Sequence, residues 1–448
     1  MNSLDPALDL FPLAASLLAA ITCAVLGNFL LLRRESLMGD AISHGVLPGL
    51  VIGFLLTGDR DPTTMLAGAT AAGIVTVLLV MLVRNVGRVE SGAAMGVVFS
   101  VLFAIGVLLI ERAARQTDLD ADCVLHGQLE TLAWYDAPTE WSGVPAWATV
   151  ESIPRQVWGL AIACTLACGF VLAFFKELRL AAFDPELAAA LGLRPKLIDL
   201  ATMILVAIAT VASFEAVGSI LVIAMLICPA ATARLLTDRL SRQVTWSILI
   251  ASITAAVGYR AATVVPSWFE AESVNAAGSM TVAAGVVLLF AILAAPTHGV
   301  ISKRVRATRL RRQVAIDDLL ASLLRLEESS SATDSATSRS TRIRRASPPT
   351  IERARGSGLV TGKDWPTLSL TEEGRRAARD VLRRHRLWET YLVEKAGFSP
   401  DHVHDPAEVL EHLGPMPPEL ATRDPHGRTI PSPDRTDRTR RSNPGPPG

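Results

Sequence analysis

The sequence predicts an all-α, polytopic membrane protein of about nine transmembrane helices, followed by a small α domain in the cytoplasm. Hydrophobic residues make up 50% of the 448-residue chain, and its mean hydropathy is +0.36. These residues gather in blocks that end near residue 295, and the rest of the chain is polar and rich in Arg and Pro. The blocks indicate a bilayer as the solvent of the first two thirds of the chain.

A helix that crosses a bilayer needs about 20 mostly apolar residues, and nine stretches approach this length. The second stretch is short and begins among polar residues, so we expect it to be broken or only partly inserted. The first stretch has no basic segment before it, which predicts a retained helix and not a signal peptide. The predicted spans are 10–32, 42–57, 64–83, 92–110, 157–175, 197–213, 217–235, 243–259 and 278–296.

Basic residues follow every second predicted span. Lys and Arg accumulate in cytoplasmic loops, so these loops predict nine spans with the N-terminus outside and the C-terminal third in the cytoplasm. The residues are Arg33, Arg34, Arg84, Arg88, Lys176, Arg179, Arg194, Lys196, Arg234, Arg239, Arg242, Lys303, Arg304 and Arg306.

The loop at residues 183–195 carries the signals of a short helix. Asp184 can cap its N-terminus, Pro185 suits its first position, Glu186 lies in its first turn, and Gly192 can end it. Such a helix is either a simple connector or a docking element for a separate subunit.

Asp40 and His44 form a polar pair inside an apolar stretch. Four residues apart on a helix, they share one face. A carboxylate and an imidazole suit Mn²⁺, Zn²⁺ or Fe²⁺, and ionisable groups at membrane depth are usually functional. Two ligands make an incomplete site, which a symmetric dimer would double. A helix cap combined with a polar contact between helices is the alternative.

Three stretches resemble the membrane permease subunits of the zinc/manganese/iron ABC importer family: residues 35–49, 183–195 and 217–233. The resemblance covers roughly residues 10–300. It implies a type II importer fold in the bacterial cytoplasmic membrane, paired as a homodimer or heterodimer. It also implies an external metal-binding protein and a divalent metal as cargo. A cytoplasmic ATPase would dock on Phe183, Asp184, Pro185, Glu186, Ala189 and Gly192.

The C-terminal segment contains a second set of ligand-type residues. His385 and Glu389 lie four residues apart, and four more such residues fall on a following helix: His404, Glu408, Glu411 and His412. This region is similar to the diphtheria-toxin-repressor family of metal-dependent regulators, and the resemblance implies that these six residues bind metal. A carboxylate at Glu408 favours Mn²⁺.

A DNA-binding domain of this kind needs an intact recognition helix. The sequence shows a wing-like portion from Gly358 to Thr371 but no clear recognition helix. We therefore expect a metal-sensing or dimerising appendage, and nucleic acid is not an expected partner. A degenerate relic is the alternative.

Four parts are expected along the chain: a transmembrane domain at 1–300, a basic helix with a Ser/Thr/Arg linker at 301–349, the metalloregulator-like domain at 350–428, and a disordered tail at 429–448.

The chain has no phosphate-binding Gly-x-x-x-x-Gly-Lys-Ser/Thr motif, so ATP hydrolysis must come from another subunit. Two other functions stay open. A secondary metal carrier needs more intramembrane carboxylates, and a membrane-anchored regulator needs far fewer spans.

Overall fold

The computed structural model forms two compact units, Met1–Lys303 and Arg304–Gly448. Each unit is described here by itself. The structure describes residues 6–57, 61–113, 127, 129–132, 134, 153–266, 274–329, 347–363, 367–413, 423–427 and 429–430. The predicted Ser/Thr/Arg linker and most of the predicted tail lie outside these residues.

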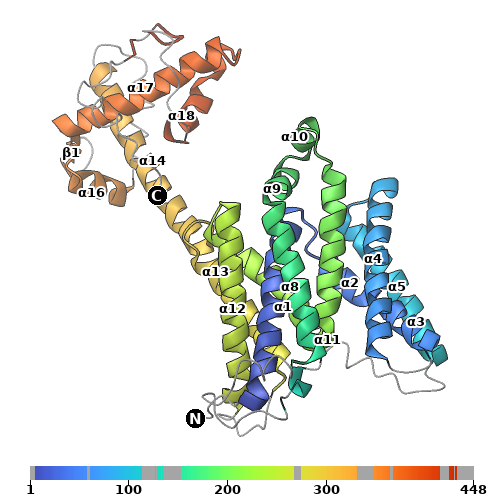
Figure 1. The fold of residues 1–448 in the computed structure, drawn as a ribbon. Coiled ribbons are helices and arrows are strands. Elements are labelled where there is room, and N and C mark those ends of the chain that lie inside the picture. The colour runs from blue at the N-terminus through green and yellow to red at the C-terminus, as the bar shows by residue number, and fades with distance from the viewer. Residues whose placement is uncertain are drawn as a thin grey trace. The chain divides into compact units, whose positions relative to one another are not determined.

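The first unit is a bundle of helices (Figure 1). In the described part of the chain, eight helical segments are long and apolar enough to cross a membrane, which confirms the predicted fold class. The helices are α1 (Pro6–Leu32), α2 (Met38–Gly45), α3 (Leu47–Thr57), α4 (Pro62–Gly87), α5 (Ser91–Ala113), α8 (Arg155–Ala173), α9 (Phe175–Phe183), α10 (Pro185–Ala190), α11 (Pro195–Leu236), α12 (Leu240–Val264) and α13 (Ala276–Ala294), with a 3₁₀ turn η1 (Leu129–Thr131).

The second crossing is divided into α2 and α3, with Val46 between them. Pro48 explains the division. A proline has no N–H to donate to the carbonyl four residues earlier, which here belongs to His44, and its ring crowds that carbonyl. The expectation of a broken second span is therefore confirmed.

The longest helix, α11, changes direction at Gly218, whose φ of 77° and ψ of 163° are not helical. Its start is tied to the end of α1, because Asp199 pairs with Arg33. Its end leads directly into α12, where Gln243 donates a hydrogen bond of 2.9 Å to Asn28, again near the end of α1. Both ends of α11 therefore lie at one end of the bundle, and the helix crosses the bundle twice.

With α11 counted twice, the eight candidate segments become nine crossings in the described part of the chain, as the sequence predicts. The turn is closely packed. A Cβ added to Gly127 would lie 2.4 Å from the backbone nitrogen of Gly218. Only the two glycines allow this approach of main chain to main chain. We call the end that holds Arg33, Arg84 and Arg234 the basic end of the bundle.

The second unit packs helices around a two-stranded sheet. Its elements are α14 (Val300–Ser329), whose first residues precede the unit boundary, α16 (Pro348–Gly356), β1 (Val360–Thr361), β2 (Ser369–Leu370), α17 (Glu372–Glu394), the 3₁₀ turn η4 (Pro400–His402) and α18 (His404–Leu413). The strands are antiparallel, with Val360 opposite Leu370. Leu320 and Leu324 of α14 share the core with Ile351 of α16. The leucines of α14 therefore belong to the core of this unit.

The helix α16 directly precedes the β1–β2 hairpin, where the sequence shows no clear helix. It is short, and its residues Ile351 and Ala354 are buried in the core. Pro406 lies in the first turn of α18, where a helix tolerates proline.

Candidate functional site

Asp40 and His44 lie on α2 and face one another. Oδ1 of Asp40 is 3.5 Å from Nε2 of His44, and the two side chains are 39% and 34% exposed. The backbone carbonyl of Asp40 accepts a hydrogen bond from the Ser43 hydroxyl at 2.8 Å. The carboxylate and the imidazole therefore converge on a point that is still open on one side.

The end of α2 that follows His44 lies beside the centre of α4. A Cβ added to Gly45, the residue after His44, would lie 2.3 Å from Oγ1 of Thr76. Thr76 is close to the centre of α4, which runs from Pro62 to Gly87. His44 therefore lies near the level of the centre of α4, and Asp40, one turn earlier on α2, lies closer to the basic end of the bundle.

Aromatic side chains of α5 lie beside the histidine. The ring of His44 is 5.7 Å from that of Phe99 and 5.5 Å from that of Phe103, the second at an edge-on angle of 86°. These rings restrict the orientation of the imidazole. Within the described residues, the chain brings two ligand-type side chains to this point, so a full coordination shell needs further ligands from elsewhere.

The predicted helix in the loop after α9 is present as α10. The side chain of Asp184 accepts a hydrogen bond of 2.9 Å from the backbone nitrogen of Leu187, and Pro185 is the first residue. Gly192 has a φ of 84°, and the backbone nitrogen of Leu193 donates to the carbonyl of Ala188, which closes the helix.

The apolar residues of this helix are exposed. Phe183, Leu187 and Leu191 follow one another at intervals of four residues, and their exposed fractions are 56%, 47% and 66%. Phe183 ends α9, Leu187 lies on α10, and Leu191 directly follows α10, and we call these three exposed side chains the apolar stripe. Leu187 and Leu191 are not among the docking residues predicted from the sequence, and the spacing of the leucines could have indicated them.

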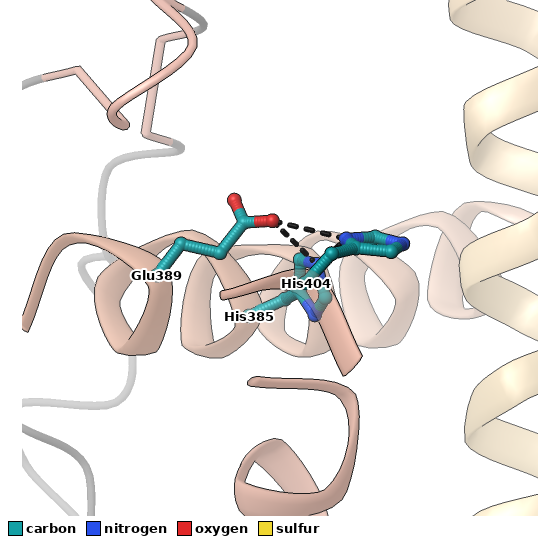
Figure 2. Close-up of side chains that lie close together, drawn as sticks. All are labelled: His385, Glu389 and His404. Atoms are coloured by element: carbon teal, nitrogen blue, oxygen red, sulfur yellow. Dashed lines mark hydrogen bonds and ion pairs between the residues drawn. The ribbon is translucent and has the colours of Figure 1, made fainter. Parts of the chain in front are cut away.

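In the second unit, His385, Glu389 and His404 meet at one point (Figure 2). Oε1 of Glu389 lies 3.1 Å from Nε2 of His385 and 3.0 Å from Nδ1 of His404. The two imidazole nitrogens are 2.9 Å apart. Three ligand-type atoms thus converge from α17 and α18.

The carboxylates and imidazoles at this point shift one another's pKa. Burial alone would raise the pKa of Glu389, but hydrogen bonds with His385 and His404 hold this pKa well below its usual range. Burial opposes protonation of His385, and the neighbouring carboxylates of Glu389 and Glu411 nevertheless raise its pKa. Oε2 of Glu389 is buried without a hydrogen-bond partner. A buried acceptor of this kind, beside two imidazoles, fits a cation.

A second group lies close by and consists of Asp318, Glu411 and His412. Nε2 of His412 is 3.1 Å from Oδ1 of Asp318 and 3.3 Å from Oε1 of Glu411. Nδ1 of His412 is 3.5 Å from Oδ2 of Asp317. The sequence analysis missed both aspartates, because α14 reaches this group only through the tertiary fold.

The sixth predicted residue, Glu408, lies toward the second group. Burial raises the pKa of Asp318, and the charges of Glu408 and Glu411 add to this effect, while His412 opposes it. The six predicted residues therefore fall into two neighbouring groups, which Glu411 joins, and Asp318 completes the second.

Comparisons with known proteins agree with this division of the chain. Residues 10–137 and 149–295 match the ABC 3 transport family, and residues 371–432 match the iron dependent repressor, metal binding and dimerisation domain. The manganese transport system membrane protein MntD of Bacillus subtilis (strain 168) is 39% identical over 303 residues, 68% of this chain and 97% of that protein.

Two further similarities cover different extents of the chain. The manganese transport system membrane protein MntC of the same organism is 29% identical over 424 residues, 90% of this chain and 89% of that protein. Among solved structures, PsaBC from Streptococcus pneumoniae in complex with Fab matches with a TM-score of 0.50 and 26% identity, covering 64% of this chain and 92% of that one.

Proposed function

Because the chain belongs to the ABC 3 transport family, we propose that it is the membrane-spanning subunit of an ATP-binding-cassette importer for a divalent transition metal. A separate ATPase would supply the energy, and an external metal-binding protein would deliver the cargo. The similarity to two proteins named as manganese transport subunits makes Mn²⁺ the first metal to test, with Zn²⁺ and Fe²⁺ in parallel.

The observation that supports transport most directly is the position of Asp40 and His44. The two side chains converge on α2, between the basic end and the centre of α4, and remain partly exposed. A carboxylate or imidazole at this depth costs free energy, so it is retained where it serves an ion. The pair would act as transient ligands for the cargo, and a second membrane subunit would supply the matching ligands.

Uptake of radioactive ⁵⁴Mn²⁺ tests this role in cells that lack other manganese importers. Asp40→Ala and His44→Ala should each reduce uptake to the background of cells without the transporter, with normal amounts of the protein in the membrane. Ser43→Ala is the matched control on the same helix, because its hydroxyl bonds only a backbone carbonyl in the described structure. Unchanged uptake in the Asp40 and His44 variants would remove the pair from the transport path.

The ATPase would dock on α10. The predicted docking residues Phe183, Asp184, Pro185, Glu186, Ala189 and Gly192 form or flank this helix. Its exposed apolar stripe supports the assignment, because an exposed stripe of large apolar side chains in a polar loop suits a protein partner. The basic end of the bundle, from which α10 extends, would then face the cytoplasm, in agreement with the positive-inside rule. The N-terminus would lie outside.

The second unit would sense metal in the cytoplasm. Its two groups, His385 with Glu389 and His404, and Asp318 with Glu411 and His412, each offer three ligand atoms of the types that Mn²⁺ and Zn²⁺ accept. In both groups carboxylates accompany imidazoles, and the described ligands include no thiolate. Occupation of these groups by metal would restrain transport when the internal metal is plentiful.

Uptake over a range of internal manganese tests this feedback. The double variant His385→Ala, Glu411→Ala should continue to import Mn²⁺ at internal concentrations that stop the unmodified protein. Continued shut-off in this variant would refute the feedback and leave the transport function intact.

A further inference from the structure

Four charged side chains form a connected cluster at the basic end of the bundle. Arg84 of α4 uses both of its terminal nitrogens: Nη1 pairs with Glu35, and Nη2 lies 3.0 Å from Oδ2 of Asp199. Arg33 pairs with the other carboxylate oxygen of Asp199. The four residues therefore form an ion-pair chain in the order Glu35, Arg84, Asp199, Arg33.

The ion-pair chain is largely shielded from solvent. The side chains of Glu35 and Arg33 are 4% and 9% exposed. Burial, together with the charge of Asp199, raises the pKa of Glu35 to about 6, although both arginines oppose this shift. Desolvation offsets much of the attraction in buried ion pairs, so such pairs are weak evidence for stability alone and often fix one geometry.

Asp199, the third member of the ion-pair chain, is attached to the segment that follows α10. Asp199 lies in the second turn of α11, and residues 191–194 are the whole connection between α10 and α11. Backbone hydrogen bonds close α10 at one end of this connection and begin α11 at the other. The nitrogen of Leu193 donates to the carbonyl of Ala188 at 3.0 Å, and the nitrogen of Ile198 donates to the carbonyl of Arg194 at 3.2 Å. A displacement of α10 would therefore move the start of α11 and its aspartate.

Glu35, the first member of the ion-pair chain, lies in the segment that precedes Asp40 and His44. The backbone nitrogen of Glu35 donates to the carbonyl of Leu30 at 2.9 Å, and its carbonyl accepts from the nitrogen of Met38 at 3.0 Å. Met38 is the first residue of α2, two residues before Asp40. The position of Glu35 thus helps to set where α2 begins.

We propose that Arg33, Glu35, Arg84 and Asp199 are positioning residues of the transport cycle, which transmit the movement of α10 and α11 to α2 and so to Asp40 and His44. This inference rests on the proposed function, because it takes α10 as the ATPase docking helix and Asp40 with His44 as cargo ligands. Arg84 is the central link, since it is the residue that contacts both Glu35 and Asp199.

A purely structural cluster would have a different signature. If the ion pairs only held the bundle together, their loss would lower the amount of folded transporter without changing the metal moved per ATP hydrolysed. A transmission role predicts the opposite result: normal amounts of a transporter that hydrolyses ATP but moves less metal for each ATP.

The experiment uses the complete transporter, purified through a tag on this chain and reconstituted in proteoliposomes with Mn²⁺. Arg84→Lys keeps the charge but cannot reach both carboxylates with a planar fork, so the ratio of uptake to ATP hydrolysis should fall at least about fivefold, the lower range of allosteric coupling. Arg33→Lys should lower the ratio less than Arg84→Lys does, because Arg33 contacts a single carboxylate through Nη1.

Two further comparisons complete the design. Glu35→Gln and Asp199→Asn should each lower the ratio. The double variant should lower it no further, because the loss of one ion pair already interrupts the connection between α11 and α2. Asp238→Asn removes ion pairs with Arg234 and His298 at the same end and should leave the ratio unchanged.

A normal ratio in both Arg84→Lys and Glu35→Gln would overturn the inference. The Asp40→Ala variant in the same vesicles separates this failure from that of the proposed function. If Asp40→Ala abolishes uptake while the cluster variants keep the normal ratio, the transport role stands and the transmission role falls. If Asp40→Ala transports normally, the proposed function itself fails.

Discussion

Oε2 of Glu411 lies 2.5 Å from Nδ1 of His385, while Oε1 of the same carboxylate is 3.3 Å from Nε2 of His412. A carboxylate that binds Nδ1 of a histidine orients the ring and leaves Nε2 to face a cation. Here Nε2 of His385 is the atom that points to Glu389 and His404. Glu411 is therefore itself a member of the group that contains Asp318 and His412, and it orients His385 in the group that contains Glu389 and His404.

Glu411→Gln should weaken metal binding at both groups. Loss of an orienting carboxylate typically costs a factor of about 10 to 100 in metal affinity. Metal bound per chain, measured by mass spectrometry of the purified protein titrated with Mn²⁺, should show two weakened sites. Glu408→Gln is the comparison variant, and it should weaken only the group that contains Asp318. Equal effects of the two variants would contradict the bridging role of Glu411.

Asp318→Asn should weaken the group that contains His412 without affecting the group around His404. The carboxylate of Asp318 lies 3.1 Å from Nε2 of His412, and an amide is a poorer ligand for a hard cation. The same titration should show one weakened and one normal site. A normal titration of both sites would exclude Asp318 as a ligand.

Leu187→Asp should detach the ATPase from the transporter. The substitution places a charge in the middle of the exposed apolar stripe of α10, where a docked partner would have to desolvate it. The ATPase that purifies with the tagged chain should fall to background. Glu177→Gln on α9 is a surface change outside the stripe and should retain the ATPase.

Gly218→Ala should destabilise the bundle. The φ of 77° and ψ of 163° belong to a region open essentially to glycine alone, and a side chain there costs on the order of 1–3 kcal/mol. The thermal midpoint of the purified protein should fall. Gly285→Ala is the matched control, because a Cβ at Gly285 meets nothing within 4 Å and should leave the midpoint unchanged or raised.

Much of the first unit could be predicted from hydropathy and loop charge. The blocks of apolar residues identify every crossing, because the backbone in a bilayer has few alternatives to the helix. The reversal inside α11 was also predicted, as spans 197–213 and 217–235, and the observed break at Gly218 lies a few residues after the predicted loop between them. The shortness and polar start of the second span indicated the division into α2 and α3.

The sites were predicted in part. Spacing of four residues on one helix brought Asp40 to His44 and His385 to Glu389, because helix geometry alone sets that proximity. The contribution of Asp318 could not be predicted, since 94 residues separate it from His412 and no local rule joins them. The ion pairs of Arg84 with Glu35 and Asp199 depend equally on tertiary packing. Helix α16, from Pro348 to Gly356, did not stand out as a recognition helix in the sequence, because it is only nine residues long.

The break between α2 and α3 at Val46 restricts the kinds of molecule that can contact the bundle there. The helical hydrogen bond from residue 48 to the carbonyl of His44 cannot form, because Pro48 has no N–H. Hydrocarbon tails cannot donate a hydrogen bond to such a carbonyl, so an interrupted helix in a membrane lies against protein or water at the interruption. The carbonyl of His44 therefore lies against protein or water and not against hydrocarbon, and α4 supplies part of that protein, since Gly45 packs against Thr76.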